Sequence, residues 1–151
     1  MAQEDKELLL KDLCARLPYG VKVCIKLPNH QKKAFEEQIG DLKEFTKYGG
    51  YLVNSKGIDY RSFNLDIKPY LRPMSSMTDE EREEWTDLFL ISVVTELEQY
   101  SDDEAEDIAP KLYASSHVKS LNWLNKHHFD YNGLIEKGLA IEVTAENNPY
   151  K

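Results

Sequence analysis

The segment Val21–Leu27 alternates strictly between apolar and polar side chains, and this pattern constrains the fold more than any other feature of the sequence. Side chains of a β-strand point alternately to opposite faces, so the pattern predicts a strand with one buried and one solvated face. Such one-sided strands are typical of antiparallel sheets. Further short strands are predicted at Ala34–Ile39, Leu42–Phe45, Tyr51–Val53 and Tyr60–Ile67. For residues 31–48 a short helix remains an alternative.

Helices are predicted on both sides of these strands. Glu4–Leu17 has leucines at helical spacing and ends before Pro18. Thr78 and Glu81 form a capping box at the start of a helix expected to reach about Tyr100. A second late helix is expected from His117, capped by Ser116, to about His128, after a loop over Ser101–Pro110.

The predicted class is therefore α+β: an N-terminal helix, a small antiparallel sheet of short strands and two C-terminal helices. Within this order, Pro69 and Pro73 predict an extended segment with little strand pairing at residues 70–72. A last short strand is expected around Leu139–Val143. A chain of 151 residues predicts one domain, over residues 1–145, followed by a flexible tail at 146–151.

Charge is segregated along the chain. Thr78–Ile108 holds thirteen acidic residues and one base, so it carries −12, whereas the whole chain carries −8 and the remainder sums to +4. Clustered charge of this kind governs association rate and choice of partner. The predicted acidic surface consists of Asp79, Glu80, Glu83, Glu84, Asp87, Asp102, Asp103 and Glu104.

The apolar segment Leu88–Val94 lies in the middle of the acidic stretch. A helix that is apolar all round is buried on all sides. The segment therefore predicts either burial within this chain or a homodimer formed through Leu88–Val94.

Several classes of protein are disfavoured by the sequence. The acidic start and the lack of a long apolar segment favour a cytoplasmic protein without a membrane span or a secretory leader. Cys14 and Cys24 have neither metal nor redox spacing, and no glycine-rich phosphate loop occurs. We therefore expect no cofactor and no metal.

Two groups of residues could still carry chemistry or bind nucleic acid. His127, His128 and Asp130 could form a catalytic loop, although a helix that ends in histidine is favoured by its dipole alone, and no catalytic residue is assigned. Residues 43–72 interleave basic and aromatic side chains that could stack on bases. Acidic residues in the same stretch reduce its net charge to +3, and direct nucleic-acid binding is not expected.

Two stretches, residues 67–78 (IKPYLRPMSSMT) and 127–140 (HHFDYNGLIEKGLA), together resemble a group of small uncharacterised proteins of gut bacteria and their prophages. The resemblance implies a cytoplasmic protein of a mobile element and carries over no catalytic residue. Binding residues tend to lie on loops held by a scaffold. If these two loops meet, they would form a binding patch of Tyr70, Arg72, Met74, His127, Asp130 and Tyr131; the alternative is that they only pack together, with Arg72 paired to Asp130.

The leading functional hypothesis is a non-enzymatic protein-interaction module, an accessory protein of a mobile element, with an unidentified protein partner. The alternatives are an acidic mimic of nucleic acid that inhibits a DNA-processing enzyme, and a small enzyme that uses the His127/His128/Asp130 loop.

Overall fold

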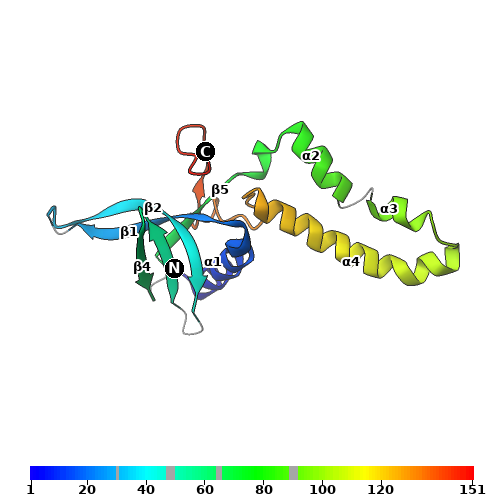
Figure 1. Ribbon diagram of the computed structural model, residues 1–151, viewed down its shortest axis with the longest axis horizontal. Helices are drawn as coiled ribbons and strands as arrows, with labels where there is room; N and C mark the ends of the chain where they lie inside the picture. Colours follow the sequence, from blue (N-terminus) through cyan, green and yellow to red (C-terminus); the bar gives the residue numbers. More distant parts are fainter. Residues whose placement is uncertain (30, 47–49, 64–65, 89–91) are drawn as a thin grey trace. The chain divides into compact units, whose positions relative to one another are not determined.

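The computed structural model describes residues 1–29, 31–46, 50–63, 66–88 and 92–151 (Figure 1). The chain forms two compact units. Unit 1 contains Met1–Met74 and His128–Lys151, and unit 2 contains Ser75–His127. We describe each unit by itself, and the single domain predicted for residues 1–145 stays a prediction.

Unit 1 is built on a sheet of six described strands in the order β4-β3-β2-β1-β5-β6. All neighbouring pairs are antiparallel except β5–β6, which is parallel. The α+β class is confirmed, but the sheet is larger than the small antiparallel sheet that was predicted. The strands are β1 (Lys22–Asn29), β2 (Ala34–Phe45), β3 (Tyr51–Ser55), β4 (Ile58–Ser62), β5 (Ile67–Leu71) and β6 (Ile141–Glu142).

One face of this sheet forms the core of unit 1 with α1 (Gln3–Arg16), which confirms the predicted N-terminal helix. Leu9 and Leu13, one turn apart on α1, are fully buried in the same cluster as Val21, Val23 and Ile25. The alternation seen in the sequence therefore marks the buried face of β1. Cys24, which was expected on the wet face, is also buried.

The ambiguous stretch after β1 is a strand. β2 runs without a break over twelve residues, pairs with all of β1, and shifts register against β3 between Leu42 and Glu44. Gly40 lies where this strand crosses the core, and a Cβ atom there would overlap the side chain of Val53. Because Gly40 has no side chain, the Val53 side chain of the neighbouring strand β3 can occupy this space.

A tight hairpin joins β3 to β4. Lys56 and Gly57 both have positive φ, 51° and 80°, as a two-residue type I′ turn requires. This confirms the turn predicted from Asn54–Gly57. Lys56 takes the left-handed conformation without being glycine, whereas Gly57 adopts it freely.

The strand predicted over Tyr60–Ile67 is wrong. β4 ends at Ser62 and β5 begins at Ile67, and the two strands have β3, β2 and β1 between them. Phe63, which was expected to face inward, is 76% exposed, whereas Ile67 is buried as predicted, and Leu65 lies outside the described residues. In a flat sheet β4 and β5 would be about 19 Å apart. The five-residue step from Ser62 to Ile67 spans at most ~18 Å, so the sheet must curl.

The segment between the two prolines was also predicted wrongly. Instead of forming a segment with little pairing, Tyr70 and Leu71 belong to β5 and pair with Ile141 and Glu142 of β6. The preceding Pro69 pairs with Val23 of β1. Proline is tolerated there because pairing with β6 begins only at Tyr70, so at Pro69 the strand has β1 alone as a neighbour.

Unit 2 consists of the described helices α2 (Asp79–Thr86), α3 (Ser92–Leu97) and α4 (Asp102–Lys126). The capping box is confirmed: Thr78 Oγ1 accepts a hydrogen bond from Glu81 N, and Thr78 N donates to Glu81 Oε2. The helix predicted to continue to Tyr100 is described as α2 and α3. Its apolar centre at residues 89–91 lies outside the described residues.

The loop predicted over Ser101–Pro110 is instead the first part of α4. Ser101 accepts a hydrogen bond from Glu104 N, and three acids occupy the first turn, so this end of α4 satisfies both its amide groups and its dipole. The helix then continues through Pro110. Ser116, predicted as a cap, lies mid-helix and donates a 2.6 Å hydrogen bond to Leu88 O, which ties α4 to the end of α2 (Figure 1).

Candidate functional site

The two loops of the predicted binding patch meet inside unit 1. Arg72 N donates a 2.8 Å hydrogen bond to His128 O, and Asp130 N donates one of 2.8 Å to Arg72 O. Arg72 therefore forms a parallel bridge with Phe129, and its guanidinium carbon lies 4.2 Å from the centre of the Phe129 ring. The contact that joins the loops is thus made by backbone and by packing on an aromatic ring.

The other predicted patch residues have different environments. Both carboxylate oxygens of buried Asp130 accept backbone hydrogen bonds, from Leu134 N and Ile135 N, each at 2.9 Å. Tyr70 is buried, Met74 and Tyr131 are half-buried, and His127 belongs to unit 2. Asp130 thus shapes the following turn, and a shared surface of all six residues stays a prediction.

The histidine loop shows packing contacts. His127 stacks on Trp123 in unit 2, with ring centroids 4.1 Å apart. His128 stacks on Tyr150 in unit 1, with ring centroids 3.7 Å apart, and holds a positive φ of 64°. Because Asp130 already accepts two backbone hydrogen bonds, these contacts support a structural role for the loop.

Asp12 and Arg16 form a buried ion pair that the sequence reading missed. Arg16 Nε donates to Asp12 Oδ2 at 2.6 Å, and Nη2 donates to Asp12 Oδ1 at 3.0 Å, with both side chains fully buried. Nη2 also donates to Phe129 O at 2.7 Å, and Asn132 Nδ2 donates to Asp12 Oδ1 at 2.8 Å. The pair fastens α1 to the loop that follows Phe129. The sequence signal was an acid and a base at i, i+4 spacing beside Leu9 and Leu13 on the apolar face of the helix.

Tyr150 ties the expected tail to the sheet. Its hydroxyl donates to Tyr70 O at 2.8 Å and accepts from Lys22 N at 3.2 Å. Burial raises the pKa of Tyr150 to about 12. Mobility of residues 146–151 stays a prediction, and these bonds give Tyr150 fixed partners in unit 1.

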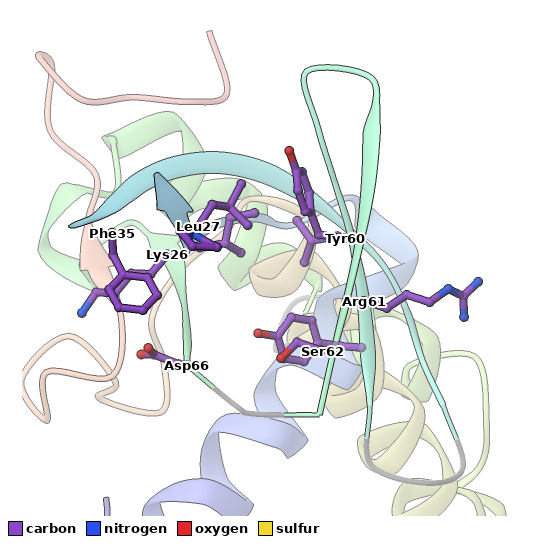
Figure 2. A pocket seen from close by; sticks show the side chains of 11 residues that line it. Lys26, Leu27, Phe35, Tyr60, Arg61, Ser62 and Asp66 are labelled. Carbon is purple, nitrogen blue, oxygen red and sulfur yellow. The ribbon is translucent and has the colours of Figure 1, made fainter. Parts of the chain in front are cut away.

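A hollow of about 570 Å³ lies on the curled sheet of unit 1. Figure 2 shows Leu27 and Phe35 of the β1–β2 hairpin on one side and Tyr60 and Ser62 of β4 on the other, with the Arg61 side chain pointing away. Phe35 is 72% exposed. Sequence reasoning did not find this site, because it depends on the curl of the sheet rather than on any local pattern.

All eight residues of the predicted acidic surface are exposed. On α2, a rotation of 100° per residue places Asp79, Glu80, Glu83, Glu84 and Asp87 within an arc of about 140°. On the opposite side of α2, Trp85 Nε1 donates a 2.6 Å hydrogen bond to Ser120 Oγ of α4.

The acids at the start of α4 form a separate group within unit 2. Trp85 contacts α4 at Ser120, about 25 Å along the helix from Asp103. The acidic surface therefore comprises one face of α2 and one end of α4.

The apolar segment proposed for a homodimer is only partly described. Val93 is buried and Val94 is 52% exposed, while residues 89–91 lie outside the described residues. A homodimer through Leu88–Val94 stays a prediction.

The candidate metal ligands and the two cysteines are considered for the part of the chain that the structure describes. Within it, no group of three or more metal-ligating side chains comes together. Cys14 is exposed and Cys24 is buried, both are free, and burial raises the pKa of both thiols.

The sequence and the fold were compared with known proteins. No protein-family model, curated protein or solved structure matches this chain. Among the described helices, none combines the length and the apolar composition needed to cross a bilayer.

Proposed function

We propose that this chain is a non-enzymatic protein-interaction module whose acidic α2 face binds a basic surface on a partner protein. The observation that carries the proposal is the arrangement of α2: five exposed carboxylates share one face, while Trp85 on the opposite face is hydrogen-bonded to α4. Described residues form no ion pair with these five carboxylates. The face is therefore available to cationic groups of another protein.

The charges on α2 are held in place before a partner arrives. The Thr78 capping box fixes the first turn of α2, and the Ser116–Leu88 hydrogen bond fixes its far end against α4. A rigid surface loses little conformational entropy on binding, and a field of one sign accelerates association with an opposite charge. Both effects support a docking role rather than a merely solubilising one.

The mobile-element context rests on the resemblance of residues 67–78 and 127–140 to proteins of bacterial prophages. An accessory protein of this kind would act by binding a protein of its host. This context suggests a bacterial lysate as the first source of partners.

The test is affinity capture from a bacterial lysate, followed by binding measurements on the purified partner. The variant E83Q/E84Q/D87N removes three charges from the later part of α2, where negative charge does not stabilise the helix dipole. The matched control E136Q/E142Q/E146Q removes three exposed charges from unit 1. We expect the α2 variant to bind at least ~10-fold more weakly and the control to bind normally.

Salt dependence provides the second readout. Binding that is steered by charge should weaken between about 0.05 and 0.5 M salt, as the Debye length falls to a few ångströms. Equal binding by the α2 variant and its control would refute the proposal. If the partner is a DNA-processing enzyme and duplex DNA displaces this chain from it, the result supports the nucleic-acid mimic instead.

A further inference from the structure

β4 is the last strand of the sheet, and its outer edge has no strand partner among the described residues. Among the described strands, β4 pairs with β3 alone. The two-residue turn at Lys56 and Gly57 joins them, with Ser55 opposite Ile58. In such a hairpin the residues that flank the turn are hydrogen-bonded to each other, and bonded and non-bonded pairs then alternate. Accordingly, Asp59 and Arg61 direct their backbone groups outward.

The edge of β4 lacks two common barriers to pairing with another strand, a proline and a β-bulge. Natural edges are also protected by short strands and by charged side chains, and β4 is five residues long with two charges. β4 has no proline and pairs with β3 in a continuous register over all five residues. Its two charged residues, Asp59 and Arg61, alternate with Tyr60, which lines the hollow.

The sequence of β4 is complementary to itself. If β4 pairs antiparallel with β4 of a second copy and Tyr60 lies opposite Tyr60, then Asp59 of each copy lies opposite Arg61 of the other. Those two residues are also the ones whose backbone groups point outward, so the charge pairs coincide with the hydrogen-bonded pairs. One two-fold axis through Tyr60 then generates both ion pairs.

Neighbouring registers are disfavoured by the same charges. The pairing centred on Asp59 brings two carboxylates together, and the pairing centred on Arg61 brings two guanidinium groups together. Like charges directly opposite one another destabilise a sheet. Of these three registers, only the one centred on Tyr60 places opposite charges together.

We propose that this protein forms a two-fold symmetric homodimer in which β4 strands of two copies pair antiparallel about Tyr60. The interface continues the sheet from one copy into the other. It places the two hollows on the same face, with Tyr60 of both copies between them. This interface involves unit 1 and is independent of the acidic surface proposed above.

Single charge reversals test both the surface and the register. In D59R or R61D, both cross-strand pairs become like-charged, and we expect the dimer dissociation constant to rise about 10-fold or more. Sedimentation equilibrium over about 1–200 µM protein at ~0.15 M salt measures it, since salt screens the net charge of −8 on each copy. The matched control for D59R is E142R, the same change from an acid to arginine on β6, at the other end of the sheet.

Complementation excludes a simple loss of folding. The variants D59R and R61D mixed together should form a heterodimer, because every cross-strand pair is then of opposite charge, and the swap D59R/R61D should restore the homodimer. Circular dichroism of each variant checks that unit 1 is folded, since Asp59 also accepts a hydrogen bond from Asn54. A wild-type monomer at 200 µM overturns the proposal. So does a dimer that neither reversal weakens, as expected for an interface at Leu88–Val94, or a loss that mixing does not repair.

Discussion

Arg16 holds Asp12 through two hydrogen bonds within one turn of α1, and neither side chain has any exposed surface. A buried charge is tolerated only while its partner is present. Arg16 also donates to Phe129 O, so the ion pair fixes α1 to a segment more than a hundred residues later in the chain. The stability of unit 1 therefore depends on the Asp12–Arg16 pair and on the hydrogen bond that joins Arg16 to Phe129.

Replacing Arg16 by methionine should destabilise unit 1 by about 3–5 kcal/mol, because it leaves the Asp12 carboxylate buried without its cation. Urea denaturation followed by circular dichroism measures the change. The double variant D12L/R16M should cost less than R16M alone, because no buried charge remains. A double variant at least as unstable as R16M would contradict this account.

Tyr150 should make stability depend on alkaline pH. Its pKa is about 12 in the folded protein and about 10 when unfolded, so the folded state holds its proton over a wider range. The contribution is complete below pH 10 and is lost as pH rises from 10 to 12. The difference in unfolding free energy between wild type and Y150F should therefore shrink over that window, and a constant difference would argue against the burial of this hydroxyl.

Alanine at Gly40 should destabilise unit 1 by about 1–3 kcal/mol, because the new methyl group overlaps Val53. Shortening Val53 should relieve the overlap. In a double-mutant cycle, G40A should therefore cost less in a V53A background than in wild type. Additive effects of the two substitutions would show that Gly40 is required for another reason.

Pro110 lies inside α4, and replacing it should strengthen the helix. P110A supplies the amide that can donate to Glu106 O and removes the ring from the helix interior. We expect unit 2 to gain about 1–3 kcal/mol of stability and the far-ultraviolet helical signal to increase. Lower stability in P110A would mean that α4 depends on a bend at this position.

Local patterns predicted the elements that local physics determines. The leucine spacing of α1, the alternation of β1 and the capping box at Thr78 each reflect forces between residues close in sequence. Tyr60–Ile67 failed because its alternation continues across the end of one strand and the start of another. Only the order of the sheet, which depends on long-range pairing, separates β4 from β5.

The later errors have a similar origin. The Ser101–Pro110 segment looks like a loop because it is acidic and contains proline, yet Ser101 and the first-turn acids start a helix. Contacts with α3 and the Trp85–Ser120 hydrogen bond hold this helix in unit 2. The two loops of the predicted patch meet through the backbone of Arg72, a contact that the side-chain pattern did not predict. The acidic residues were expected on the surface, and all eight are exposed.

Unit 1 is assembled from two stretches of chain with all of unit 2 between them, and this has a consequence for biosynthesis. Residues 128–142, which are synthesised after unit 2, supply the partners of the Arg16 guanidinium, the edge of β5 and the amide of Arg72. The ribosome must therefore complete unit 2 before β6 is available to pair with β5. Until then the nascent N-terminal half lacks the carbonyl partner of Arg16 and leaves the edge of β5 unpaired with β6, and unpaired strand edges make such intermediates prone to aggregation.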